Sequence, residues 1–439
     1  MQTPTNRAEK NWVLGVTALA SFMMALDAMI ITTAFATIRA EFGSPVETLQ
    51  WTVNAFNLTF AVLLLTGAAL GDRFGRRRMF ATGIALFVVA SAACALAGNA
   101  TALIAARALG IFASITGCAL IIGPAIGGFI TEHFGWRWVF WINLPIGLIA
   151  IALVLARLRE SFGPAAALDI AGLALVALAA LALVWSLLRG NAVGWASAEV
   201  MGTLMSGLVF TAGFVLWELR AAAPMVPMRL FASRALASGM SASVLFYAAM
   251  YGVLFLLPQF LQTTLGFDAF GAGLRLLPWT ATLFVTAPIA GAVVNRFGER
   301  PLVVTGLLMQ AIGLGWIAEI VSPTVAYSAM VAPLVLAGVG VSMAMPAAQN
   351  AVLSSVAVAE MGKVSGIFNM GRFLGGMFGI AALVANFSAN GGAYSAAHFE
   401  SGFAAAMRLA AMLSLVGAIA GLFLPARRRT ASAAAPQDA

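Results

Sequence analysis

The chain has 439 residues, of which 62% are hydrophobic and only 9% are charged, and its formal net charge is +8. Soluble domains are about 25% charged, so too few polar residues are present to cover a water-soluble core. The basic residues stand in short turns between apolar runs, which favours membrane topology signals over nucleic-acid binding. The composition therefore indicates a protein embedded in a lipid bilayer, with no nucleic-acid partner.

Apolar runs of about 20 residues or more recur along the whole sequence. Such runs are typical of transmembrane helices, and they lack the polar–apolar alternation of membrane barrel strands. Arg7 and Lys10 precede the first run, which has no small-residue cleavage site and is interpreted as a retained helix. We predict an all-α polytopic membrane protein with about 13 transmembrane helices, at 12–38, 50–71, 79–99, 101–131, 139–157, 169–188, 199–219, 236–260, 271–294, 301–321, 325–349, 363–387 and 402–425.

The turns differ in charge, which assigns them to the two sides of the membrane. Basic turns are predicted to be cytoplasmic, like both termini, and turns without Lys or Arg (262–270, 322–325, 388–401) are predicted to be outside. The turns near residues 99 and 132 are both predicted to be outside, so the chain must cross the membrane an even number of times between them. Two crossings need about 40 apolar residues, and only about 30 are available. Either one helix is missing, or the charge bias fails in every later loop.

Two distant turns have nearly the same sequence. Gly71-Asp72-Arg73-Phe74-Gly75-Arg76-Arg77-Arg78 follows the second run, and Val294-Asn295-Arg296-Phe297-Gly298-Glu299-Arg300 follows the ninth. A basic, glycine-containing turn repeated between paired spans marks a two-fold internal repeat. In membrane proteins such a repeat is typical of transporters whose two halves rock against each other.

The residues that could carry other chemistry are few. Cys94 and Cys118 lie in apolar runs, and His133 and His398 are isolated, so no metal site or cofactor is expected. The sequence contains no phosphate-binding loop or catalytic triad pattern, so we expect neither an enzyme nor ATP-driven transport.

Asp27 lies within the first apolar run, about 22 Å along a helix from Asn11. A carboxylate at that depth is costly and is by default functional, here as a group that binds and releases a proton. The alternative is a carboxylate that reaches water at the outer end of the helix.

Five short patterns occur in the order found in a known family. They are Leu26-Asp27; Gly67 to Arg78; Gly123-Pro124-Ala125-Ile126-Gly127-Gly128; Gly135-Trp136-Arg137-Trp138 with Asn143-Leu144-Pro145-Ile146-Gly147; and Arg372-Phe373-Leu374-Gly375-Gly376. With them the chain resembles, over nearly its whole length, the 14-helix drug/proton antiporters of the major facilitator superfamily (EmrB/QacA type). The resemblance implies a two-bundle fold and proton-driven efflux of lipophilic or cationic drug-like compounds. It also implies a bacterial inner membrane and a periplasmic adaptor protein as a candidate partner.

The resemblance further implies roles for single residues. Proton coupling would fall to Asp27 and Arg107, with snorkelling of Arg107 to the outer surface as an equal alternative. The two loop motifs would latch conformational states, or would only anchor topology through their arginines. The antiporter motif would let helices pack closely, with or without a role in transport. The residues concerned are Gly67, Gly71, Asp72, Arg73, Gly75, Arg76 and Arg77 in the first loop, Arg296, Gly298 and Arg300 in the second, and Gly123, Pro124, Gly127 and Gly128 in the antiporter motif.

A substrate cavity between the halves is expected to be lined by Met and aromatic side chains, which adapt to varied lipophilic ligands. Lipid contact or core packing is the alternative for most of them, and a snorkelling anchor is an equal alternative for an arginine. The candidates are Met23, Trp51, Asn54, Tyr247, Tyr251 and Arg372.

The chain departs from the family at one place. The family has an Arg-Ala-Leu triplet at the start of both the fourth and the fifth helix, whereas this chain has the single copy Arg107-Ala108-Leu109. The fourth helix and the loop after it are therefore expected to be absent, in agreement with the crossing count. The expected domains are an N-terminal bundle at 1–158, an inserted helix pair at 159–220, a C-terminal bundle at 221–426 and a disordered tail at 427–439.

Two other functions remain open at this point. The chain could export a specific metabolite or a sugar. It could also be a deletion product that inserts into the membrane but does not transport.

Overall fold

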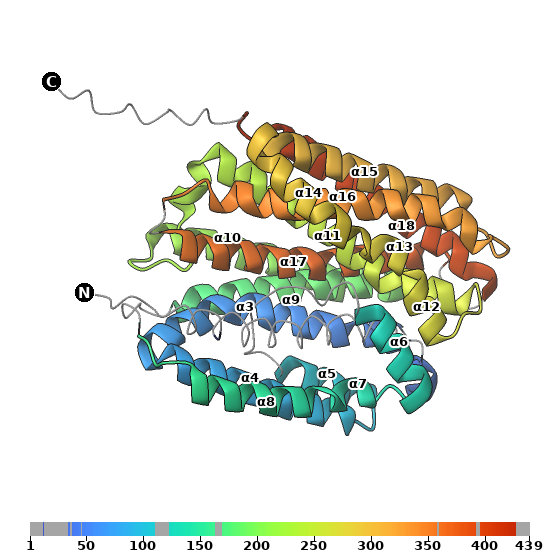
Figure 1. Ribbon diagram of the computed structural model, residues 1–439, viewed down its shortest axis with the longest axis horizontal. Helices are drawn as coiled ribbons and strands as arrows, with labels where there is room; N and C mark the ends of the chain where they lie inside the picture. Colours follow the sequence, from blue (N-terminus) through green and yellow to red (C-terminus); the bar gives the residue numbers. More distant parts are fainter. Residues whose placement is uncertain are drawn as a thin grey trace.

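The computed structural model describes residues 12, 34, 35, 37–44, 46–109, 123–162, 169–357, 360–391 and 396–426, and all regular structure within these ranges is helical. The long helices run along the same axis, with the first half of the chain at the bottom of Figure 1 and the second half at the top. Many large apolar side chains are exposed on the outside of the bundle, such as Val89, Leu148, Val209, Val285 and Met412. A hydrocarbon environment explains such a surface, because lipid solvates apolar side chains.

The first half contains seven described helices. They are α2 (Val46–Leu49), α3 (Trp51–Phe74), α4 (Arg76–Ala95), α5 (Ala100–Leu109), α6 (Gly123–Phe134), α7 (Trp138–Trp141) and α8 (Asn143–Arg157). α4 packs on α8, and α3 packs on α5 and α4. The predicted span at 139–157 is formed by α7 and α8 together, and most of the predicted span at 12–38 lies outside the described residues.

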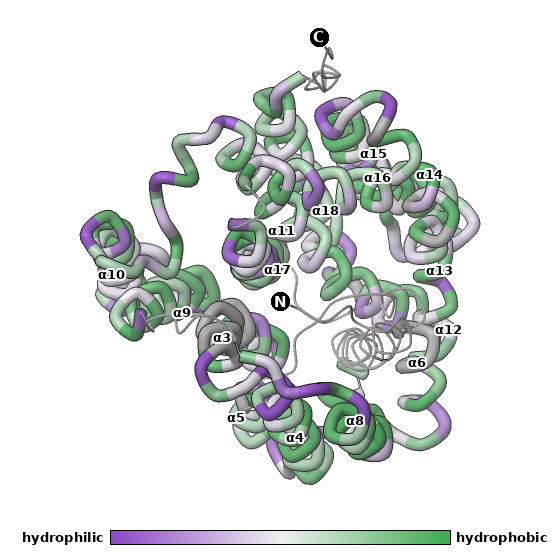
Figure 2. Tube along the Cα trace, turned by 60° about the vertical axis from the view of Figure 1, so that its left-hand side comes forward, coloured by the Kyte–Doolittle hydropathy of each residue, from purple (hydrophilic) through white to green (hydrophobic). Residues whose placement is uncertain are grey.

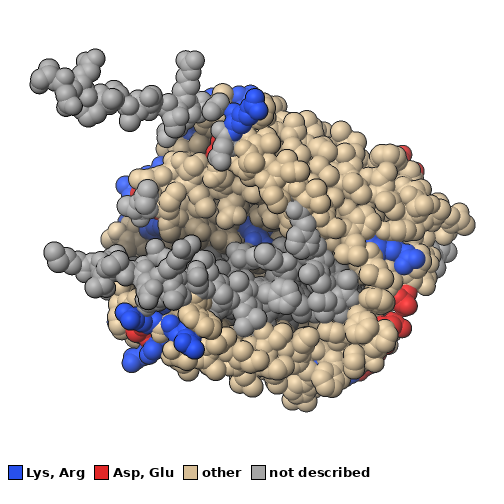
Figure 3. Space-filling view, viewed as in Figure 1, with Lys and Arg blue, Asp and Glu red and all other residues tan. Residues whose placement is uncertain are grey.

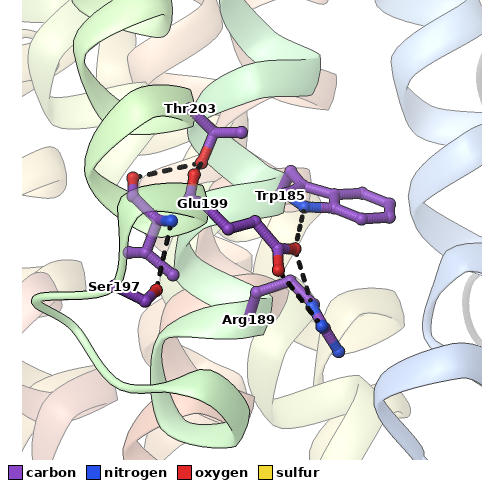
Figure 4. Close-up of polar contacts among 6 residues, drawn as sticks. Trp185, Arg189, Ser197, Glu199 and Thr203 are labelled. Atoms are coloured by element: carbon purple, nitrogen blue, oxygen red, sulfur yellow. Dashed lines mark hydrogen bonds and ion pairs between the residues drawn. The ribbon is translucent and has the colours of Figure 1, made fainter.

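The inserted helix pair consists of α9 (Ile170–Val193) and α10 (Ala198–Arg220). Asp169 caps α9 by accepting a hydrogen bond from the amide of Gly172 (2.8 Å), as its position before the helix predicts. At the other end of the hairpin, Glu199 accepts hydrogen bonds from Arg189 and from the indole of Trp185 (Figure 4). α9 packs on α3 and α17, whereas α10 is the outermost helix in Figure 2. The pair is therefore attached through α9.

The second half starts with a short 3-10 helix, η2 (Met228–Ala232). It continues with α11 (Arg234–Thr263), α12 (Ala269–Arg275), α13 (Leu277–Thr280), α14 (Thr282–Phe297), α15 (Glu299–Ile320), α16 (Tyr327–Leu353), α17 (Met361–Ala389) and α18 (Ala396–Leu422). α11 and α17 pack on each other and are the most completely buried of the long helices. The predicted span at 271–294 is three consecutive short helices, α12 to α14, with Pro278 in the first turn of α13.

The region predicted as one span at 101–131 contains two described helices. Ala100–Leu109 and Gly123–Phe134 are helical, and residues 110–122 between them lie outside the described residues. The guanidinium of Arg137, just after α6, donates to the carbonyl of Ala97, just before α5 (3.3 Å). Ala97 and Arg137, which flank this region, therefore lie on the same side of the bundle. This agrees with the even number of crossings that the charge pattern requires.

The charges separate along the bundle. Figure 3 shows Lys and Arg mostly at one end of the visible face and Asp and Glu mostly at the other. Helices that begin in basic turns, such as α4 at Arg76, end at the opposite side. Among the described residues, nine helices are long and apolar enough to cross a membrane. The chain is therefore a multi-pass membrane protein.

Candidate transport site and its loop motifs

The two loop motifs form the same turn in both halves. Gly75 ends α3 with φ of 103°, and Gly298 ends α14 with φ of 85°. The amide of Gly75 donates to the carbonyl of Gly71 (3.0 Å), and that of Gly298 donates to the carbonyl of Val294 (2.8 Å). Residues that carry a side chain rarely adopt such φ values, so glycine is needed at both places. The internal repeat is thus present in the backbone geometry.

The arginines of these motifs lie at the surface. Arg73 is exposed and its guanidinium carbon lies 5.4 Å from the ring centre of Phe74, and Arg296 lies 5.6 Å from the ring centre of Phe297 in the same way. Arg76 is exposed, and Arg300 is partly buried. The side chain of Asp72, which would form the latch, lies outside the described residues. Of Gly67, the structure describes only the helical backbone.

Glu160, which sequence reasoning did not single out, holds the first loop motif. Its carboxylate accepts hydrogen bonds from the backbone amides of Arg77 (2.8 Å) and Arg78 (3.3 Å) at the first turn of α4. The guanidinium of Arg77 lies 3.8 Å from the same carboxylate. A helix N-terminus favours a negative charge, so Glu160 stabilises the start of α4. Its distance of 83 positions along the chain explains why no local pattern reveals it.

The antiporter motif meets the other half of the molecule. A Cβ atom added at Gly128 would overlap the carbonyl oxygen of Ala269 and lie 2.7 Å from the Cα of Phe270 in α12. Phe129 also meets the ring of Phe270 edge-on, with ring centres 5.6 Å apart. α6 and α12 are therefore in backbone contact at the outer end of the bundle, as a small-residue motif allows. Of Gly123, Pro124 and Gly127, the structure describes only the helical backbone.

A second contact closes the outer end of the first half. The indole N–H of Trp136 donates to one carboxylate oxygen of Glu41 (2.6 Å), and Arg137 forms an ion pair with the other (2.7 Å). The Trp136 hydrogen bond holds the pKa of Glu41 below its usual value, partial burial opposes this, and the bond and charge of Arg137 lower the pKa further. The Gly-Trp-Arg-Trp stretch therefore joins three segments of the first half.

Arg107 lies inside the first half. It is only 3% exposed, so the alternative in which it snorkels to the outer surface is wrong. Its Nε donates to the carbonyl of Thr52 (3.1 Å), and its guanidinium lies over the ring of Phe56 at 4.7 Å. Asp27, its proposed coupling partner, lies outside the described residues, as does Met23.

The other cavity candidates of the first half are on α3. Trp51 packs against Trp185 of the inserted pair, with ring centres 6.1 Å apart. Asn54 is fully buried, and among the described residues neither its amide nitrogen nor its carbonyl oxygen has a hydrogen-bond partner. The structure therefore places Trp51 at the contact with α9 and leaves Asn54 as a buried polar group.

The cavity candidates of the second half lie together. Nη2 of Arg372, on α17, donates to the hydroxyl of Tyr251 on α11 (3.2 Å). The Arg372 guanidinium also lies 5.1 Å from the ring centre of Tyr247, which is 1% exposed. These three residues, predicted separately, thus form one contact between the two most buried helices.

A small cavity of about 30 Å³ lies between α11, α13, α14 and α16. Leu254 lies three residues beyond Tyr251 and is therefore one turn further along the same helix face. The walls are mostly apolar and contain two methionines, as an adaptable ligand site requires. They are formed by Met250, Leu254, Trp279, Thr280, Leu283, Val341, Ser342 and Met345.

These features define a helical membrane transporter built from two related halves. The chain belongs to the Major Facilitator Superfamily, whose sequence profile matches residues 17–110, 105–379 and 239–439. Two solved structures show the same fold: the nucleoside transporter NupG (TM-score 0.64, 11% identity, 94% of this chain and 99% of that one) and a POT family transporter (TM-score 0.65, 14% identity, 92% and 94%).

Several relatives are more similar in sequence. The tetracenomycin C resistance and export protein of Streptomyces glaucescens is 31% identical over 397 residues, covering 83% of this chain and 74% of the relative. The multidrug transporter protein MdtP of Bacillus subtilis is 30% identical over 408 residues (85% and 74%). The cephamycin export protein CmcT of Amycolatopsis lactamdurans is 31% identical over 462 residues (97% and 94%).

Proposed function

We propose that this chain belongs to the drug efflux branch of the superfamily and is built to export lipophilic drug-like compounds by alternating access. The observation that carries this proposal is the set of relatives named as export and multidrug resistance proteins, which match over 74–94% of their own length. The apolar, methionine-containing cavity of the second half supports a lipophilic cargo.

The contacts between halves support alternating access. α6 and α12 touch through backbone at Gly128, which closes the outer end in this conformation. For the substrate to leave, these helices must separate while the inner ends approach, and both loop motifs lie at those inner ends.

We further propose protons as the coupling ion and Asp27 as the group that carries them. We also propose a bacterial inner membrane, as the family resemblance implies, with both termini in the cytoplasm, as the basic turns predict. The periplasmic adaptor protein stays a prediction from the family resemblance.

The coupling proposal is tested by substrate efflux in inverted vesicles with an imposed pH gradient, using ethidium as the probe and the chain with a fourth helix inserted after Arg107 as the parent. In this parent, Asp27→Asn is expected to abolish pH-driven efflux while membrane insertion is kept. Glu319→Gln is the matched control, because Glu319 is an exposed carboxylate paired with Arg408 (3.0 Å) at the protein surface. Undiminished pH-driven efflux by Asp27→Asn would remove Asp27 from the mechanism.

A second candidate function, a deletion product that does not transport, is favoured by the alignments. The match to CmcT spans 462 positions, yet 97% of 439 residues is about 426, so about 36 positions of the alignment have no residue of this chain. The match to the tetracenomycin exporter spans 397 positions, and 83% of 439 residues is about 364, so about 33 positions of that alignment have no residue of this chain. In total, the unmatched positions are about as many as one membrane helix with a loop contains.

The position of the gap is suggested by the family profile. Its first match ends at residue 110 and its second begins at residue 105, which brackets Arg107-Ala108-Leu109. The described part of α5 reaches Leu109, and residues 110–122 lie outside the described residues. We therefore propose that the fourth helix is absent, and the measurement that separates the two candidate functions is proton flux in proteoliposomes with and without ethidium.

A further inference from the structure

Arg372 lies in the middle of a membrane-spanning helix. It is 11 residues from the start of α17 at Met361 and 17 from its end at Ala389, so it is about 17 Å from the nearer end. A charged side chain at that depth is costly and usually marks a substrate or ion site. Its contacts with α11 direct it into the bundle and away from lipid.

The partners of Arg372 are all uncharged. Nη2 donates to the Tyr251 hydroxyl, and the guanidinium lies over the rings of Tyr247 (5.1 Å) and Phe373 (5.4 Å). Among the residues that the structure describes, its Nε has no hydrogen-bond partner and no carboxylate is within ion-pairing distance of Arg372. A partly buried cation whose described partners are uncharged, and whose Nε can still donate, can attract an anion.

The surroundings of Arg372 also fit an aromatic ligand. The ring of Tyr247 is 6.2 Å from those of both Tyr251 and Phe368, so aromatic faces line this side of α11. The Tyr251 hydroxyl accepts a hydrogen bond from Arg372 and keeps its own hydrogen to donate to the same anion. The apolar cavity begins one helix turn away at Leu254, with Trp279 and Met345 in its walls.

We propose that Arg372, Tyr247 and Tyr251 form an anion subsite, and that the preferred cargo is an aromatic acid whose ring system packs against the aromatic side chains on this side of α11. This inference rests on the proposed export function and narrows it, because a fixed positive charge repels lipophilic cations. Arg372 would donate to the carboxylate from Nε, while Tyr251 would orient the guanidinium.

Binding to the purified chain in lipid nanodiscs tests this inference with three probes that share one ring system. They are 2-naphthoate, 2-naphthamide and 2-naphthylmethylammonium, titrated by calorimetry against empty nanodiscs as background. We expect the anion to bind the wild-type chain at least about tenfold more tightly than the amide, and the cation to bind most weakly. Arg372→Gln should bring the ratio of anion to amide affinity close to one, and Arg372→Lys should keep part of it.

Arg234→Gln is the matched control. Arg234 is on α11, the helix of Tyr247 and Tyr251, and like Arg372 it lies over an aromatic ring, that of Phe423 at 5.5 Å, but it is exposed at the inner end of the helix. Its removal should leave the anion preference unchanged. If Arg372→Gln no longer binds the amide either, the ratio of anion to amide affinity in Arg372→Lys decides whether the charge of Arg372 sets the anion preference.

Three results would overturn the inference: no binding of any probe, tighter binding of the cation than of the anion, or an unchanged ratio in Arg372→Gln. Failure of the export function is seen separately. An anion preference without proton-dependent efflux contradicts only the proposed function, whereas efflux with a cation preference contradicts only the anion subsite.

Discussion

Gly75 and Gly298 stand 223 residues apart and turn the chain in the same way, each with a positive φ between two antiparallel spans. In both copies the arginine two positions earlier lies over the phenylalanine that follows it. Among the described contacts, the first loop donates to a distant carboxylate, that of Glu160, whereas in the second loop Glu299 accepts a hydrogen bond from Asn350. A Cβ added at Gly75 would lie 2.6 Å from Cδ of Glu160.

Alanine at these two glycines should therefore destabilise the chain unequally. The backbone strain is about 1–3 kcal/mol in each case. Gly75→Ala should lower the thermal midpoint in detergent further than Gly298→Ala, because its methyl group displaces Glu160 from the N-terminus of α4. Gly202→Ala in α10 is the control, since open space surrounds Gly202 and no loss is expected. Equal losses at Gly75 and Gly298 would show that the Glu160 contact contributes nothing.

Removal of Glu160 should loosen the first turn of α4. Glu160→Ala deprives the amides of Arg77 and Arg78 of their acceptor, at a cost of about 0.5–2 kcal/mol for a lost cap. Hydrogen exchange of a peptide covering residues 75–82 should accelerate. Glu160→Gln should show a smaller effect because its side-chain oxygen still accepts. Glu132→Ala, an exposed carboxylate at the opposite end, should change nothing there.

The Glu41 contact should make the outer end sensitive to acid. The pKa of Glu41 in the folded chain lies below its ordinary value of 4.5, so the folded state favours the carboxylate. The stabilisation is fully present above about pH 4.5 and is lost as the pH falls through the lowered pKa. Thermal unfolding at pH 7 and at pH 3 should differ less in Glu41→Gln than in the wild-type chain.

The donor in this contact can be changed separately. Trp136→Phe removes the indole N–H that is the main cause of the lowered pKa, while the ring stays in place. It should therefore reduce the same pH difference without removing the ion pair to Arg137. A pH difference equal in all three chains would mean that Glu41 does not contribute.

The spans and turns could be predicted from the sequence because lipid imposes a local rule. Long apolar runs have to be helices, and the glycine of a basic turn has to accept positive φ, so Gly75 and Gly298 could be identified without a structure. The capping of α9 by Asp169 is equally local. These features depend on residues within a few positions of each other.

The contacts that join distant segments could not be predicted in this way. The partners Glu160 with Arg77, Glu41 with Trp136, and Arg372 with Tyr251 are separated by 83, 95 and 121 positions. The apolar cavity was missed for a related reason, because Met250 and Trp279 look like lipid-facing residues in a membrane sequence. The depth of Arg107 was open because its helix was in doubt, and its burial depends on Phe56 and Phe140 from other helices.

Restoration of the missing helix is the last prediction. Two crossings between residues 99 and 132 need about 40 apolar residues, and only about 30 are available. Each half of a transporter of this fold needs six complete helices to close its bundle. We expect the chain as it stands to show weak or no proton-driven efflux. Insertion after Arg107 of about 30 residues, comprising a fourth helix and its basic loop, should restore efflux measured in inverted vesicles.

A C-terminal reporter should be cytoplasmic with and without the insertion, because the number of crossings between residues 99 and 132 is even in both chains. The matched control is the same insertion combined with Asp27→Asn, which should insert equally well and remain inactive if Asp27 carries the coupled proton. Strong efflux by the chain without the insertion, or a periplasmic reporter, would contradict the proposed loss of the fourth helix. Efflux restored by the insertion would instead assign the inactivity of the shorter chain to the incomplete first bundle, since every other described helix is unchanged.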